Sequence, residues 1–274
     1  MTRAGAPLRL VHDADVAPQA APPAFPTVRV GGFDTIIATR KALAAHMVRD
    51  CLAARADPRA LPKLVFSSNG QGIALAGADP AFAAAMAQAD MIHADGMPVV
   101  HAARLLTRTP LPERIATTDF FHDAAQAACA ARLRFFLLGG DALQNERACE
   151  AARRLHPGLA IVGNRDGYFP DSETDAVCRQ IRDSGADVLW VALGKPKQEL
   201  WSLAHRDRLR GVGWIKTCGG LYAFLAGDAA RAPRWMQRAG LEWAHRMGQE
   251  PGRLAGRYLT TNAHALWRLA TRTG

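Results

Sequence analysis

Four short segments combine the residue types that bind and process phosphorylated ligands: Ser67-Ser68-Asn69-Gly70, Asp95-Gly96, Gly139-Gly140-Asp141 and the segment 194–199, GKPKQE. Each comes directly after a run of apolar, β-branched or aromatic residues. In an open α/β sheet, ligands bind at the carboxyl ends of the strands, where loops lead into helix N-termini with free N–H groups. The four segments therefore predict a binding site at one edge of a sheet.

Asp95 is the acidic residue best placed for proton transfer. It follows the apolar strand candidate 90–94 and precedes Gly96, which lets a ligand approach the backbone closely. A carboxylate in that place can act as a general base on a hydroxyl nucleophile. Asp is also strongly preferred as the N-cap of a following helix. The spacing alone favours the cap and leaves the base open.

The segment 194–199 also has two interpretations. It can form a phosphate-binding turn, with Lys195 and Lys197 supplying charge and Gln198 pointing into the cleft. It can equally be an exposed helix start that merely carries charge. The residues themselves do not decide between the two.

Several familiar ligand motifs are absent from the sequence. No G-x-G-x-x-G follows a strand candidate and no G-x-x-x-x-G-K-[ST] occurs, which argues against dinucleotide oxidoreductases and P-loop NTPases. The one D-x-D triplet is Asp13-Ala14-Asp15, near the N-terminus, and the nine His show no ligand spacing. We therefore expect no metal site and no cofactor, with Arg, Lys and helix N-termini neutralising any diphosphate.

Short strand-like runs alternate with longer Ala-rich helical stretches from Thr27 onward, which is typical of parallel strands joined by helices. Several strand candidates are apolar on both faces, as expected for a sheet covered on both sides. The fold class is therefore α/β, a Rossmann-like, mostly parallel sheet with helices on both faces. The strand candidates are 64–67, 90–94, 134–138, 159–163, 187–193 and 213–217, and the helical stretches are 79–89, 97–106, 119–132, 141–155, 172–184 and 197–209.

The ends of the chain differ from this core. Residues 1–26 hold five of the 16 prolines and predict a mobile N-terminal tail, which leaves 27–227 as the core. Residues 228–274 contain eight Arg against three acidic residues, a net charge of +5. We expect them to form a basic helical appendage.

Periodicity predicts two amphipathic helices in the appendage. In the first, Met236, Ala239, Gly240, Trp243 and Met247 share a face opposite Arg234, Arg238 and His245. In the second, from about 252, Leu254, Tyr258, Ala265 and Leu269 lie together, with Arg253, Arg257, His264 and Arg268 to one side. Periodicity alone favours a hairpin packed on the core with a solvated basic face. The alternative is a surface that lies on anionic lipid, with Trp235 or Trp267 at the interface.

The amino-acid composition limits the possible functions but does not identify one. The 274 residues are 49% hydrophobic and carry a formal charge of +9, in which only five of 34 basic residues are Lys. An Arg excess suits phosphorylated ligands, nucleic acid or an anionic membrane. Five widely spread Cys argue against a disulfide framework or a zinc site, so a reducing cytosol is expected. No secretory signal and no apolar run of roughly 18 residues is present.

Taken together, the motifs resemble the WecG/TagA/CpsF family, glycosyltransferase family 26, over residues of about 30 to 260. The most specific stretch is FLAGDAARAPRWMQRAGLEWAHRMGQEPGRLAGRYL, from Phe224. The other matching stretches are Ser67-Ser68-Asn69, Ala94-Asp95-Gly96-Met97-Pro98-Val99-Val100, Glu113-Arg114-Ile115, Thr118-Asp119, Phe136-Leu137-Leu138-Gly139-Gly140, Gly167-Tyr168-Phe169 and the segment 192–199.

The resemblance implies an inverting, metal-independent transferase that moves a hexose-type sugar from a UDP-sugar to a polyprenyl-diphosphate-linked saccharide. Asp95 falls where the family has its proposed general base, so the base now outweighs the cap. Substrate-binding roles are implied for Ser67, Asn69, Arg114, Thr118, Asp119, Gln198 and Arg231. Nucleotide-binding roles are implied for Gly139, Gly140, Gly194, Lys195 and Lys197.

The resemblance also implies bacterial exopolysaccharide or cell-surface polysaccharide synthesis. The appendage would close over the site and hold a cytoplasmic enzyme on the anionic inner face of the plasma membrane, with Arg231, Arg234, Arg238, Arg253 and Arg257 serving lipid or diphosphate groups. No nucleic-acid partner is expected. Nothing decides between a monomer and a homo-oligomer.

One position departs from the family pattern. Ala223 stands where the family usually has Asp, so the contribution of that carboxylate is absent or comes from another residue. An inactive family member that only binds a sugar nucleotide therefore stays open. A nucleic-acid-binding protein is the other alternative, although it rests only on charge and lacks the interleaved aromatic residues of a stacking platform.

Overall fold

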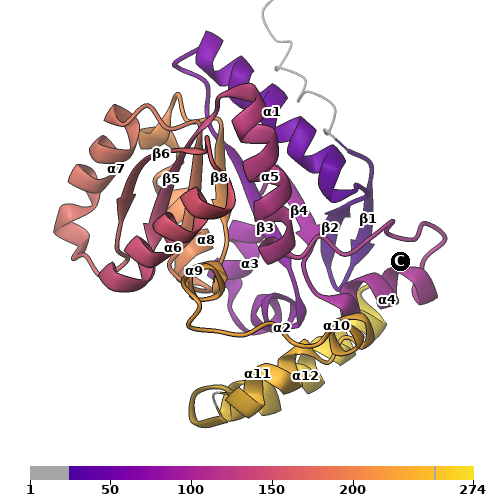
Figure 1. Ribbon diagram of the computed structural model, residues 1–274. Helices are drawn as coiled ribbons and strands as arrows, with labels where there is room; N and C mark the ends of the chain where they lie inside the picture. The colour runs from indigo at the N-terminus through magenta and orange to yellow at the C-terminus, as the bar shows by residue number, and fades with distance from the viewer. Residues whose placement is uncertain (1–24, 250) are drawn as a thin grey trace, which may run out of the picture.

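An eight-stranded sheet runs through the protein in the order β1-β2-β4-β3-β8-β7-β5-β6 (Figure 1). The computed structural model describes residues 25–249 and 251–274, without the side chains of 251, 253–255 and 257–259. All of the predicted mobile tail but its last two residues, including Asp13-Ala14-Asp15, lies outside the described residues.

The six predicted strands are confirmed, and every neighbouring pair among them is parallel. Side chains alternate between two buried faces, as β7 shows with Trp190 on one side and Leu189 and Val191 on the other. The predicted Rossmann-like α/β class is therefore confirmed. The strands are β3 (Lys63–Ser68), β4 (Met91–Ala94), β5 (Arg134–Gly139), β6 (Ala160–Arg165), β7 (Val188–Ala192) and β8 (Trp214–Thr217).

A hairpin that was not predicted extends one edge of the sheet. Its strands, β1 (Thr27–Val30) and β2 (Phe33–Ile36), are antiparallel, and β2 pairs with β4 in parallel. The two-residue turn is Gly31-Gly32, with φ of 60° and 94°. Such tight hairpins need positive φ, which glycine adopts without strain.

Helices cover both faces of the sheet, as predicted. One face packs against α1 (Arg40–Ala56), α5 (Thr117–Ala131), α6 (Ala142–Leu155) and α9 (Leu221–Ala226). The other packs against α2 (Gly70–Ala78), α3 (Pro80–Ala87), α4 (Met97–Leu106), α7 (Thr174–Asp183) and α8 (Lys197–Ala204). A short 3-10 helix, η1 (Asp171–Glu173), precedes α7, and another, η2 (Arg206–Leu209), follows α8.

The appendage, residues 228–274, contains α10 (Arg234–Ala239), α11 (Glu242–Gln249) and α12 (Pro251–Thr271) (Figure 1). The single first helix predicted through Met236 and Met247 is wrong. Gly240 adopts a left-handed conformation with φ of 75° and ends α10, so α11 takes a new direction. The apolar face expected across the break therefore does not form as one continuous stripe.

Helix α12 packs on α2 through its C-terminal half. Ala265 and Leu269 are buried, as predicted for their face. His264 and Arg268 are partly buried rather than on a solvated face, because a Cβ on Gly77 would lie 2.5 Å from His264 and 2.9 Å from Arg268. The predicted positions of Leu254, Tyr258, Arg253 and Arg257 lie outside the described side chains.

The last residues of the chain are bonded to the β1–β2 hairpin. Gly32 N–H donates to the Arg272 carbonyl at 2.8 Å, and Gly31 N–H donates to the Thr273 hydroxyl at 3.0 Å. Gly274 N–H donates to the Arg29 carbonyl at 3.2 Å. The far end of the appendage is therefore joined to the core by backbone hydrogen bonds.

Asp187 organises the edge of the sheet opposite the predicted site. Its buried carboxylate accepts 2.6 Å hydrogen bonds from Arg55 Nε and Nη2 and from the backbone N–H of Arg134. Burial raises the pKa of Asp187, but the hydrogen bonds from Arg55 and Arg134 outweigh it and hold the pKa below its ordinary value. The carboxylate therefore joins α1 to β5 and β7 in its charged form.

Replacing this carboxylate should destabilise the fold in a pH-dependent way. We expect Asp187→Asn to lower the free energy of unfolding by about 2 kcal/mol at pH 7, because it weakens several charge-assisted hydrogen bonds. A lowered folded-state pKa gives stability above the unfolded pKa of about 3.9, so the loss should shrink as pH falls below that value. Urea denaturation at pH 7 and at about pH 3, below the unfolded pKa, measures both. Asp34→Asn, on an exposed ion pair, is the control.

Candidate active site

A cavity of about 1260 Å³ lies at the carboxyl ends of β3, β4, β7 and β8. The four segments singled out in the sequence all contribute to its wall, and residues of α11 and α12 line it from the appendage side. Of the predicted site residues, those that line it are Ser67, Asn69, Asp95, Arg114, Thr118, Gly140, Gly194, Lys195, Lys197 and Gln198.

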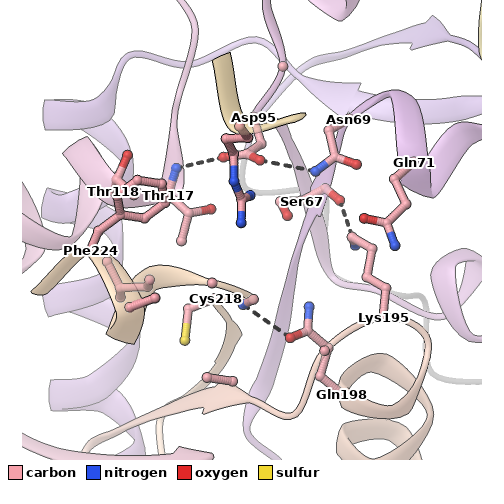
Figure 2. Close-up of a pocket in the computed structure, with 18 of the residues that line it drawn as sticks. Ser67, Asn69, Gln71, Asp95, Thr117, Thr118, Lys195, Gln198, Cys218 and Phe224 are labelled. Carbon is pink, nitrogen blue, oxygen red and sulfur yellow. Dashed lines mark hydrogen bonds between the residues drawn. The ribbon is translucent and has the colours of Figure 1, made fainter. Parts of the chain in front are cut away.

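Asp95 lies between two helix N-termini (Figure 2). Its Oδ1 accepts a 2.7 Å hydrogen bond from the backbone N–H of Thr117, and its Oδ2 accepts one of 3.2 Å from the Asn69 amide. The N-cap of the following helix, α4, is instead Gly96, which makes no side-chain cap. The predicted cap role for Asp95 on α4 is therefore wrong, and the carboxylate serves the start of α5.

The surroundings keep the Asp95 carboxyl ionised. Burial raises its pKa, but His93, the Thr117 N–H, Arg114 and Asn69 together lower the pKa below its ordinary value. Burial, with the nearby Lys216 charge, lowers the pKa of His93 well below its usual range. The Thr117 N–H, the Arg114 guanidinium and the Asn69 amide are the neighbouring groups besides His93 that favour the Asp95 carboxylate.

Asn69 does two things at once. Its side-chain oxygen accepts the Gly72 N–H at 3.0 Å as the N-cap of α2, while its amide nitrogen donates to Asp95. Ser67, the neighbouring predicted residue, is buried at the cavity wall, and its carbonyl accepts a hydrogen bond from Lys195 at 3.2 Å (Figure 2). These contacts fix the loop after β3 against Asp95.

Within the segment 194–199, Gln198 and Glu199 are buried and Lys195 and Pro196 are partly buried, whereas Gly194 and Lys197 are exposed. The segment is therefore an exposed helix start only in part. Lys195 Nζ lies 2.6 Å from the Glu199 carboxylate, which also accepts from Gln198 Nε2 at 2.8 Å. Gln198 Oε1 accepts the Gly219 N–H at 3.1 Å. The charge of Lys195 is thus already paired, whereas Lys197 lies over the Phe169 ring. The phosphate-binding turn stays a prediction.

The two glycines at the end of β5, Gly139 and Gly140, differ in position. Gly140 lines the cavity, with φ of 68°. Gly139 does not line it, and a Cβ there would lie 2.4 Å from the Ala192 carbonyl of β7. Gly139 is therefore required for the close approach of two strands behind the cavity.

Arg231 lies between the core and the appendage. It donates from Nη1 to the Thr118 hydroxyl at 2.5 Å and to Asp119 at 2.9 Å, and from Nη2 to Gln237 at 2.8 Å. Arg231 and Asp119 do not line the main cavity. They line a neighbouring one of about 640 Å³, together with Arg40, Glu113, Arg114, Arg234, Gln237 and Arg238.

Several residues that line the cavity were not predicted as site residues from the sequence. From the appendage come Glu242, Trp243 and Arg246, and from the end of β8 come Cys218 and Gly219. Arg246 and Arg231 both lie over the Phe224 ring, with the guanidinium carbons 5.5 and 5.9 Å from its centroid. The G-L-E-W block was the available indication for Glu242 and Trp243, but the assumption of one continuous helix hid where they point.

A family model described as "Glycosyl transferase WecG/TagA/CpsF family" matches residues 30–273, nearly the whole chain. The protein belongs to this family. It is therefore a glycosyltransferase, and the resemblance drawn from the sequence is confirmed. As a WecG/TagA/CpsF member it carries Ala223 on the cavity wall, at the position where Asp was expected.

The described part of this WecG/TagA/CpsF protein contains neither a cluster of metal-ligand side chains nor a helix suited to cross a membrane. Within residues 25–249 and 251–274, no three His, Cys, Asp or Glu side chains lie grouped as metal ligands would. In the same part of the chain, no helix combines the length and apolar character needed to cross a bilayer.

The double role of Asn69 can be separated by two substitutions. Asn69→Ala should lower the free energy of unfolding by about 1 kcal/mol through loss of the N-cap, whereas Asn69→Ser keeps a capping oxygen and most of that stability. Both remove the donor to Asp95, which raises its pKa. The acid limb of the transfer rate should then move to higher pH in both variants. An unchanged limb in Asn69→Ser would show that the amide does not tune Asp95.

Proposed function

We propose that the protein is an inverting, metal-independent hexosyltransferase. Its donor is a UDP-sugar and its acceptor a polyprenyl-diphosphate-linked saccharide of bacterial exopolysaccharide or cell-surface polysaccharide synthesis. The observation that carries the proposal is the ionised Asp95 carboxylate on the wall of a cavity that also holds Arg114, Lys197 and Arg246. A base and several cations in one cavity are what sugar transfer from a nucleoside diphosphate requires.

In the proposed reaction, Asp95 takes the proton of an acceptor hydroxyl as that oxygen attacks the anomeric carbon. The bond from this carbon to the diphosphate breaks on the opposite side, so UDP leaves and the configuration inverts. The developing diphosphate charge would lie near the Gly140 loop and the start of α8, where helix N–H groups and Lys197 face the cavity. Ser67, Asn69 and Gln198 would position the sugars.

The same proposal has the enzyme act peripherally at the cytoplasmic face of an anionic membrane, where a lipid-linked acceptor lies. Support comes from α10, on which the Trp235 side chain is 64% exposed to solvent. Arg234 and Arg238 of this helix line the neighbouring cavity, and within the described residues neither forms an ion pair. Exposed Trp beside Arg suits the interface of an anionic bilayer.

Replacing the proposed base tests the reaction. Asp95→Asn should lower the turnover number about 100-fold or more, the usual contribution of a general base, with the circular dichroism spectrum unchanged. Release of UDP from UDP-sugars, with a polyprenyl-diphosphate-saccharide acceptor and EDTA present, is the assay, and Asp34→Asn is the control. Near wild-type turnover in Asp95→Asn would place the base elsewhere. Strict dependence on added Mn²⁺ or Mg²⁺ would refute the metal-free mechanism.

Membrane association can be tested at the exposed ring. Trp235→Ala should weaken sedimentation of the protein with anionic vesicles several-fold, because it removes interfacial apolar area of about 150 to 250 Å². Leu143→Ala is the matched control, since Leu143 is also exposed but lies on α6 rather than on α10. Equal partition of both variants and the wild type would contradict a membrane role for α10.

A further inference from the structure

Glu242, in the first turn of α11, reaches two arginines from different parts of the chain. Its Oε2 lies 2.6 Å from Arg114 Nη2, and its Oε1 accepts from Arg231 Nε at 3.1 Å. Arg114 precedes α5, and Arg231 lies in the segment between α9 and α10. All three side chains are partly buried, and Glu242 and Arg114 line the main cavity. One carboxylate therefore joins α11 to the core.

The two guanidinium groups contact different oxygens of the same carboxylate. Planar guanidinium forks bind carboxylates and phosphates with the same geometry. The Nε of Arg114 is buried and has no hydrogen-bond partner among the residues that the structure describes, so the Glu242 carboxylate leaves part of its donor capacity unused. A diphosphate offers more oxygens and more charge than one carboxylate, and it can satisfy donors that Glu242 does not reach.

We infer that Arg114 and Arg231 form a diphosphate subsite, that Glu242 occupies it in the empty enzyme, and that a diphosphate group displaces Glu242. The inference rests on the proposed function, in which both substrates carry a diphosphate. Displacement breaks the ion pairs between α11 and the core. Because Trp243 and Arg246 of the same helix also line the cavity, filling the subsite changes the wall that faces the sugars.

If Glu242 competes with a diphosphate, its neutralisation changes the diphosphate affinity in the opposite direction from that expected for a purely structural role. If Glu242 competes with the anion, neutralising it strengthens diphosphate binding. If Glu242 only holds α11 in place, neutralising it leaves binding unchanged or weakens it. Asp228 provides a matched control, because it is an appendage carboxylate in the same cavity that contacts Gln144 and Arg147 rather than Arg114 or Arg231. Asp228→Asn alters the cavity charge by the same amount as Glu242→Gln.

Calorimetric titration of the full chain with inorganic pyrophosphate tests the sign. Glu242→Gln should lower the dissociation constant about two- to fivefold, the range that one partly exposed ion pair supports, while Asp228→Asn should leave it within error of wild type. Equal or weaker binding by Glu242→Gln would overturn the inference. So would equal strengthening by both variants, which would show a general charge effect, or a lack of binding by any protein.

Hydrogen exchange provides a second measurement that does not depend on activity. In the wild type, pyrophosphate should speed exchange in α11, because it releases Glu242, whereas a ligand usually slows exchange. In Glu242→Gln, exchange in α11 should be fast before pyrophosphate is added and should change little afterwards. Slower exchange in wild-type α11 with pyrophosphate would overturn the inference.

The experiments can refute the proposed transfer reaction and the displacement of Glu242 independently of each other. Transfer that depends on Asp95, without the Glu242 pattern, would leave the enzyme proposal standing and refute the displaced carboxylate. The Glu242 pattern, without transfer from any UDP-sugar, would support the diphosphate subsite and refute the proposed reaction.

Discussion

The two hydrogen bonds accepted by the Asp95 carboxylate are the interactions on which the site depends. A buried carboxylate needs its oxygens satisfied, and here the donors come from the start of α5 and from the N-cap of α2. The backbone of Asp95 is held by the sheet, since its N–H donates to the Ser68 carbonyl of β3 at 2.8 Å. A shift in the β3–β4 register would therefore misplace a helix start as well as the carboxylate.

The two sides of the cavity are built differently. On the sheet side, charges are paired at full burial, as in Lys195 with Glu199, and Gln198 links that pair to the loop after β8. Buried ion pairs and hydrogen bonds of this kind restrict the motion of the side chains that form them, although Glu199 Oε2 has no hydrogen-bond partner among the described residues. On the appendage side, the ion pairs of Glu242 are partly exposed, and α11, which carries Glu242, has no buried residue. The buried contacts on the sheet side therefore position the reacting groups, whereas the partly exposed ion pairs of Glu242 hold an appendage that can move away from the cavity.

The site could be located from the sequence because the carboxyl ends of parallel strands lie at a common edge, so four loops that are separate in the sequence become neighbours. Features that depend on tertiary contacts were not predicted. Helix α2 has three glycines and a weak helical pattern, yet Gly77 is where His264 and Arg268 of α12 approach. The break at Gly240 has no periodic signature, so one continuous helix was predicted where α10 ends and α11 begins. Gly31-Gly32 was a readable hairpin turn, and it was overlooked in short flanking strands.

The backbone bonds that join the end of α12 to the β1–β2 hairpin have a consequence for α10 and α11. The appendage is attached to the core at both ends, by the continuous chain after α9 and by the Gly31, Gly32 and Gly274 hydrogen bonds. A segment closed into a loop in this way searches a small volume, so Glu242 has a high effective concentration at its arginines even after it leaves them. By holding the end of the appendage, the β1–β2 hairpin keeps Glu242 near its arginines. Only a group with more negative charge than one carboxylate then competes well for them.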